Sequence, residues 1–245
     1  MKRQFITILL LLTAFFAKSQ DRGISATFGV GSYNMADLKL YQDELISRLP
    51  VEARGLSYFP TYSNLRINYF KVTNRIKYGL VLAHNTTGAH ANYSDPSGYL
   101  NLNQVVGVYQ AGVSGSYRLV NVSGLELMAY GDFRLGYVRN EVTMSINTTY
   151  YFESTSQILS TVSPLLEGGL EVLYNFNNFA FGIEGGYLFD TGTKFKRGNL
   201  SSYGGTVSLA PGSDLKSELT GYRIGIKFLI WLSHDQFSEL NERIY

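Results

Sequence analysis

The chain has 245 residues, a length that suits one domain or two small ones. Its 21 basic and 19 acidic residues nearly balance, so the basic surface typical of nucleic-acid-binding proteins is excluded. Cysteine is absent, which excludes disulfides and thiolate metal sites.

The first nineteen residues have the features of a secretory signal peptide. A basic pair at residues 2–3 precedes an almost unbroken apolar run, Phe5–Phe16, and small residues lead up to a cleavage position after Ser19. The alternative is an uncleaved membrane anchor, but the run is shorter than the ~20 residues that a spanning helix needs. We therefore expect residues 1–19 to be removed and the mature chain to be exported.

Eight segments of the mature chain alternate apolar and polar residues with the two-residue period of a β-strand. No other segment is long and apolar enough for a membrane-spanning helix, although that criterion does not detect the strands of a barrel. In chain order the eight segments are Gly23–Tyr33, Tyr62–Val72, Arg75–Asn85, Val105–Val120, Leu125–Met144, Leu165–Phe176, Phe179–Asp190 and Gly221–Leu232.

The connections between these segments alternate in length. Three are tight turns, near residues 73–74, 121–124 and 177–178, and the other four are predicted as long loops. An even number of strands, with short turns on one side and long loops on the other, is the layout of an outer-membrane barrel. The predicted loops are 34–61, 86–104, 145–164 and 191–216.

Two segments have helical rather than strand spacing. The segment 35–49 is expected to pack its apolar face on the barrel mouth or the membrane rim, or to dock a partner. The tail helix, 234–245, would cover the periplasmic opening or contact a periplasmic protein. The apolar positions are Met35, Leu38, Tyr41, Leu45 and Leu49 in the first segment, and Phe237, Leu240 and Ile244 in the second.

The last strand has one wholly apolar face, from Tyr222 to Ile230, and an opposite face that carries glycine, Arg223 and Lys227. In a soluble β-protein the apolar face would point inward, whereas in a membrane barrel it meets lipid. Glycine-rich polar faces with both charge signs favour the barrel, and so do two girdles of aromatic residues on the apolar faces. The girdle residues are Tyr69, Tyr78, Tyr117, Tyr174, Phe179 and Phe228 near the short turns, and Tyr137, Tyr187, Phe189 and Tyr222 near the long loops.

In the barrel interpretation the charged faces line an interior just wide enough for side chains. Enclosed charges must be paired or wetted, so we expect a self-neutralising plug, with a narrow wet channel as the alternative. Glu184 is the expected neighbour of Arg223 and Lys227, with Glu126 and Glu171 reachable across the lumen. The predicted lumen charge network comprises Arg66, Arg118, Arg134, Arg223 and Lys227 with Glu126, Asp132, Glu167, Glu171 and Glu184.

The whole mature chain resembles a small outer-membrane β-barrel of the OmpA/OmpX-like superfamily. The pattern formed by Arg223, Gly225, Phe228 and Ile230 is similar to the β-signal that the outer-membrane assembly machinery recognises on a last strand. This resemblance implies an all-β, eight-stranded, antiparallel up-and-down transmembrane barrel over residues 20–232, inserted by that machinery into a bacterial outer membrane and surrounded by its lipid. The tail, 233–245, departs from the pattern because many such barrels end on the last strand. No peptidoglycan-binding domain is expected to follow.

No catalytic, cofactor-binding or metal site is expected. His84 and His90 lie six residues apart, which is ~20 Å along an extended strand, and Ser94 and Asp95 show no recognised motif. The predicted function is a non-enzymatic outer-membrane barrel, structural or interacting through its outer loops. A protein partner could bind through 34–61 or through the tail. The alternatives are an accessory barrel for outer-membrane assembly or protein secretion, and a rim enzyme that acts on lipid or peptide.

Overall fold

The computed structural model describes residues 22–47, 54–57, 59–96, 98–148, 151–198, 204–209 and 212–232. The predicted signal peptide and the predicted tail helix both lie outside the described residues. Within these ranges no helix is both long and apolar enough to cross a membrane.

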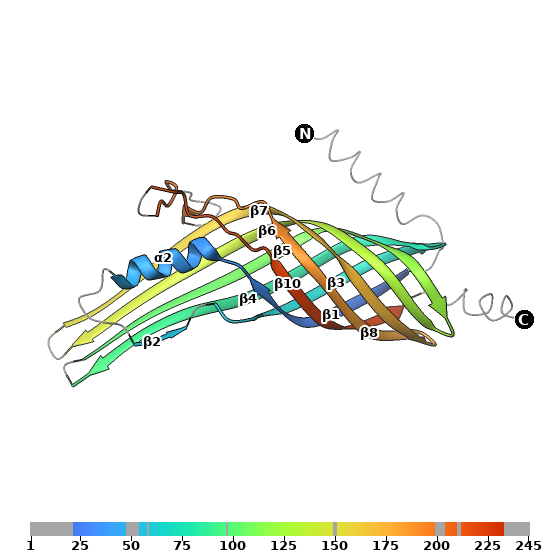
Figure 1. Ribbon diagram of the computed structural model, residues 1–245, viewed down its shortest axis with the longest axis horizontal. Coiled ribbons are helices and arrows are strands. Elements are labelled where there is room, and N and C mark those ends of the chain that lie inside the picture. Colours follow the sequence, from blue (N-terminus) through green and yellow to red (C-terminus); the bar gives the residue numbers. More distant parts are fainter. Residues whose placement is uncertain are drawn as a thin grey trace, which may run out of the picture.

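Eight long strands form a closed antiparallel ring (Figure 1). Each strand pairs with its neighbours in the chain, and the ring closes where the first strand pairs with the last, from Gly23 opposite Trp231 to Tyr33 opposite Gly221. Closure leaves the sheet no free edge over this stretch. The predicted ring of eight antiparallel strands is therefore confirmed. The strands are β1 (Arg22–Tyr33), β3 (Tyr62–Thr73), β4 (Ile76–Asp95), β5 (Gly98–Val122), β6 (Leu125–Thr148), β7 (Tyr151–Phe176), β8 (Phe179–Asp190) and β10 (Gly221–Trp231).

Three two-residue turns join strands at one end of the ring, the short-turn end. They lie at residues 74–75, 123–124 and 177–178, close to the predicted positions. Asn74, Ser123 and Asn177 have positive φ angles there, as tight hairpin turns that follow the twist of their strands require. Both chain ends of the ring, at β1 and β10, lie at this end as well.

The opposite end differs from the prediction. Segments 86–104 and 145–164 are not long loops, because β4–β5 and β6–β7 continue through them as paired hairpin strands. The four strands β4–β7 have 20 to 26 residues, whereas β1, β3, β8 and β10 have 11 or 12. Figure 1 shows the longer strands projecting well beyond the ring.

The projecting strands carry a second structural unit, here called the head. It consists of the outer parts of β4–β7, helix α2 (Ala36–Ser47) and a strap, the described residues 191–198, 204–209 and 212–219, which folds back over them (Figure 1). The short strands β2 (Arg54–Ser57) and β9 (Lys196–Arg197) pair with β4 and β7 respectively. The two remaining predicted loops are thus long connections, and the predicted helix is present over 36–47.

Helix α2 packs its apolar face inward, onto the head. Leu38 and Tyr41 are buried, and the Tyr41 hydroxyl donates to Gln157 of β7 at 3.4 Å. The strap contributes side chains such as Phe195 and Leu215 to the same buried cluster. The head therefore has an apolar core of the kind that folds in water.

The inner face of the sheet is polar in the ring and apolar in the head, and the outer face shows the reverse. Along β6, Phe133 and Leu135 are about half exposed on the outside of the ring, whereas Asp132 and Arg134 are buried inside it. Beyond Tyr137 the pattern reverses, because Val138 and Val142 are buried on the inside. The outward residues of that part include Glu141, Thr143 and Ser145. The ring is thus charged inside and apolar outside, and the head is the opposite.

Candidate functional site: the lumen charge network

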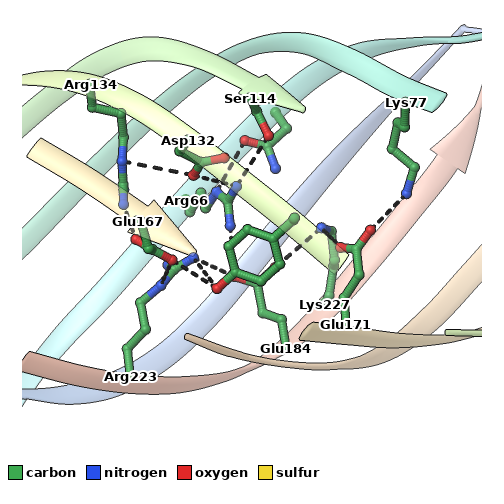
Figure 2. Close-up of polar contacts among 12 residues, drawn as sticks. Arg66, Lys77, Ser114, Asp132, Arg134, Glu167, Glu171, Glu184, Arg223 and Lys227 are labelled. Atoms are coloured by element: carbon green, nitrogen blue, oxygen red, sulfur yellow. Dashed lines mark hydrogen bonds and ion pairs between the residues drawn. The ribbon is translucent and has the colours of Figure 1, made fainter. Parts of the chain in front are cut away.

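Alternation along the strands places charged side chains at inward positions all around the ring. Figure 2 shows them meeting at its centre, with β3, β4, β6, β7, β8 and β10 all contributing. The partners in this network are often separated by more than thirty residues in the sequence. They meet only because the ring closes. All ten residues of the predicted network lie inside the ring, and nine of them are buried, Arg118 being partly exposed.

Glu184 is held by three cations. Its Oε1 accepts hydrogen bonds from Arg66 at 3.1 Å and from Arg223 at 2.9 Å, and its Oε2 lies 3.2 Å from the Lys227 ammonium. Its side chain is 1% exposed. A carboxylate this enclosed is stable in its charged form only because these partners replace water.

A second carboxylate, Glu167, lies inside the ring on the side nearer the head. It accepts hydrogen bonds from Arg134 and Arg223, and from the Tyr130 hydroxyl at 2.8 Å. Asp132 lies 2.6 Å from Arg66. The two acids and three arginines therefore form one continuous cluster with Glu184 (Figure 2).

Glu171 lies on the side of Glu184 that faces the short turns. It accepts from Lys227 and, at 3.0 Å, from Lys77 of β4. Of the three candidate partners of Arg223 and Lys227, Glu184 and Glu171 contact Lys227, whereas Glu126 lies in the network with a different partner. Glu126 pairs with Arg118 at 2.9 Å, because β5 and β6 are neighbours and the turn at 123–124 brings the two residues close.

Lys77 was missed by the sequence analysis. It alternates with Ile76 and Tyr78, which are assigned to the apolar face, so the signal for an inward position was present. With Lys77 included, the network has six cations against the five predicted carboxylates, and the buried, inward-facing Asp190 of β8 is a sixth carboxylate inside the ring.

Apolar layers close the lumen above and below the charges. At the short-turn end the layer consists of Phe70, Val72, Met128, Leu173, Ala180 and Leu229, with Trp231 packed against it. At the head, the core that includes Tyr62, Val108 and Leu188 fills the mouth. The charged groups between the two layers are therefore paired with one another and not with bulk water.

A further buried carboxylate, Asp190, ties the strap to the ring at the end of β8. It accepts hydrogen bonds from the hydroxyls of Ser163 and Ser217, the latter at 2.6 Å, and from the backbone N–H groups of Gly192 at 3.0 Å and Leu219 at 2.9 Å. All four donors are supplied by residues at the base of the strap or beside it, so Asp190 fixes both ends of the strap at one point.

The candidate rim residues do not converge. His84 faces outward and stacks on Tyr109 with ring centroids 4.6 Å apart, and His90 lies six residues further along the same strand. Asp95 accepts from the Gly98 N–H at 3.1 Å and from Tyr93 at 2.7 Å, which stabilises the β4–β5 turn. Within the described ranges, no group of three or more His, Asp and Glu residues could hold a metal ion.

The residues that resemble an assembly signal occupy both faces of β10. Arg223 and Gly225 point into the ring, where Gly225 lies against Thr27 and Gly29. Phe228 and Ile230 point outward and are 55% and 47% exposed. The signal would thus combine a lumen cation with two outward apolar side chains.

No family model matches the chain, and no curated protein matches it either. Among solved structures, the chain is similar in fold to Neisserial surface protein A, with 12% identity, a TM-score of 0.38 and coverage of 86% of this chain and 97% of that one. A major outer membrane protein from Thermus thermophilus has 9% identity, a TM-score of 0.48 and coverage of 85% and 99%. The outer membrane protease OmpT from Escherichia coli has 11% identity, a TM-score of 0.33 and coverage of 86% and 93%.

Replacing Glu184 by Gln should destabilise the protein by about 3–5 kcal/mol, because three enclosed cations lose their shared carboxylate. Glu141→Gln is the matched control, since the Arg139–Glu141 pair is about 40% exposed and such pairs contribute about 0–1 kcal/mol. Urea unfolding of the refolded protein in detergent, followed by fluorescence of the single tryptophan, Trp231, measures both. Equal effects of the two substitutions would contradict a buried network.

Replacing Asp190 by Asn should release the strap from the ring, because an amide N–H₂ cannot accept from the Leu219 N–H. The unsatisfied backbone donor would cost about 1–3 kcal/mol. Trypsin should then cleave at the strap's Lys194, Lys196 or Arg197 several times faster than in the wild type. Asp95→Asn, which alters a turn at the far tip of the head, serves as the control. Unchanged cleavage rates in the Asp190 variant would show that the strap is held by its apolar contacts alone.

Proposed function

We propose that this chain is a non-enzymatic integral protein of a bacterial outer membrane, with a closed, charge-filled lumen and a head that interacts with its surroundings on the extracellular side. The observation that carries the proposal is the polarity of the ring. Its charged residues are enclosed, and large apolar side chains are exposed on the outer face of every strand in the ring.

A continuous apolar exterior of this kind is unfavourable in water and favourable in lipid. The outward residues of β10 illustrate it, because Tyr222, Ile224, Ile226, Phe228 and Ile230 are all 47–72% exposed. The strand has 11 residues, which matches the 9–11 that a tilted strand needs to span the hydrocarbon core.

Aromatic residues lie near both ends of this apolar band. Tyr117, Tyr174 and Phe179 are exposed towards the short turns, and Tyr187 and Tyr222 contact each other edge-on at 4.7 Å towards the head. Rings with a polar tip are stable at the level of lipid headgroups. The band between the two sets would therefore be the part in contact with the hydrocarbon chains.

The head has an apolar core and a polar outer face, which supports the view that it lies in water, beyond the aromatic residues Tyr187 and Tyr222. Short turns face the periplasm and long connections face outward in outer-membrane barrels, so the head would be extracellular. Because α2 uses its apolar face for packing, a partner that binds near 34–61 would meet its outward residues, such as Leu40, which is 58% exposed.

The closed lumen favours a structural or adhesive role over transport. An accessory role in outer-membrane assembly or protein secretion is the second candidate, and the exposed head is compatible with it. Purification in mild detergent separates the two, because a stoichiometric partner protein is expected for the accessory role alone. For insertion, we propose that Arg223, Gly225, Phe228 and Ile230 act as the assembly signal.

The proposal predicts that the wild-type protein is recovered from outer-membrane fractions and migrates on SDS gels as a folded band until heated. Phe133→Lys should lower that recovery strongly, because a lysine on the lipid-facing side near the middle of the bilayer costs about 2–4 kcal/mol. Ser145→Lys, on the same face of β6 but in the head, should be recovered like the wild type. Recovery of the wild type as a soluble protein would contradict the proposal, and so would equal recovery of the two variants.

A further inference from the structure

The outward side of the head carries three cross-strand rows of side chains, here called the distal face. Each row takes one residue from each of β4, β5, β6 and β7. The side chains that alternate with them, such as Ala91 and Leu102, are buried in the core of the head, so the rows point away from it. All their members are exposed or partly exposed. From the tip towards the ring, the rows are Ser94, Tyr99, Asn147 and Phe152, then Asn92, Asn101, Ser145 and Ser154, then His90, Asn103, Thr143 and Ser156.

The composition of the distal face differs from that of an ordinary solvated surface. None of its positions is Asp, Glu, Lys or Arg, whereas about a quarter to a third of the residues on a well-solvated surface are charged. The strap of the same head exposes Lys194, Lys196 and Lys216. Four positions of the distal face are Asn, a residue that is depleted in strands. Neither solvation nor strand stability therefore explains this choice of residues.

The distal face has the chemistry that recognises uncharged sugars. Its amide and hydroxyl side chains both donate and accept hydrogen bonds, as sugar hydroxyls do. Neighbouring strands lie about 4.8 Å apart, a spacing close to the length of one sugar unit in an extended glycan. Tyr99 and Phe152 in the tip row are 45% and 66% exposed, and the C–H face of a sugar ring packs on such aromatic rings. A protein partner would instead favour Met and Arg beside the aromatic residues, and the three rows contain neither.

An open hollow of about 290 Å³ lies beside Tyr99 at the tip of the head. This volume is near the lower limit of about 300 Å³ for small-molecule sites. Asn147 and Thr148 contribute polar groups to its wall, and Asp95 is the charged residue among its described lining. Both Asp95 oxygens accept hydrogen bonds, from the Gly98 N–H at 3.1 Å and the Tyr93 hydroxyl at 2.7 Å. A fixed negative charge at this place disfavours acidic or sulfated glycans.

We propose that the distal face binds an uncharged polysaccharide from outside the cell, with a sugar ring stacked on Tyr99 and an adjoining unit in the hollow. The aromatic row and the hollow lie at the tip, far from the ring (Figure 1). Nearer the ring, the same side of the sheet carries the Arg139–Glu141 ion pair, so the glycan-like chemistry is absent where sugars of neighbouring lipids would first meet the head. The inference rests on the extracellular position of the head in the proposed function.

The first test measures binding of the purified wild-type protein, in mild detergent, to sensor surfaces that carry dextran, laminarin, mannan, heparin or polysaccharide purified from the producing cells. At least one of the three uncharged polysaccharides should bind more tightly than heparin and than the cells' own polysaccharide. The proposal would be overturned if none of the three bound, or if heparin bound as tightly as the best of them. Tighter binding of the cells' own polysaccharide would overturn the external source.

The second test places the site on the distal face. Tyr99→Ala should weaken binding of the best uncharged polysaccharide about tenfold or more, because an aromatic anchor is lost. Tyr99→Phe keeps the ring and should bind like the wild type. Leu40→Ala, at an exposed position of α2 outside the distal face, is the control and should also leave binding unchanged. Equal binding by Tyr99→Ala and the wild type would contradict the placement. Recovery from the outer membrane is measured independently, so the proposed function is tested separately.

Discussion

Six cations enclosed by a ring of eight strands impose the constraint on which the rest of the structure depends. A charge inside a closed sheet loses most of its water, and partner groups must replace it. Glu184, Glu167 and Glu171 meet this requirement by contacting two or three cations each, from strands on different sides of the ring. The ring must therefore close in one register, because a shift of one residue in the pairing of a strand would turn the charges of that strand to the outside.

The same constraint explains why one set of strands carries two opposite patterns. Where the ring is closed, charges fill the lumen and apolar side chains cover the outside. Where β4–β7 leave the ring, α2 and the strap cover their inner face, and buried residues such as Leu102 and Val142 form an ordinary apolar core. Asp190 joins the two parts, since it ends a ring strand and holds both ends of the strap.

The ring could be predicted from the sequence because apolar and polar residues alternate in it without interruption, and β8 was located with its observed bounds. The hairpins at 86–104 and 145–164 were missed because the alternation reverses there and rests on Ala, Asn, Ser and Thr, which give a weak strand signal. The pairing of Glu126 with Arg118 depends on register across one turn, and the pattern of each strand alone does not contain that information. Lys77, by contrast, could have been found from its alternation with Ile76 and Tyr78.

The two faces of β6 are expected to exchange environments at Tyr137, with lipid outside the ring and water outside the head. The chain has no cysteine, so single cysteines carrying a spin label can be placed along β6 of the protein in lipid vesicles. At positions 133 and 135 the label should collide with oxygen, which concentrates in lipid, and at positions 143 and 145 it should collide with a water-soluble nickel complex. Access of the nickel complex to positions 133 and 135 would contradict the account, because the apolar face of the ring would then lie in water.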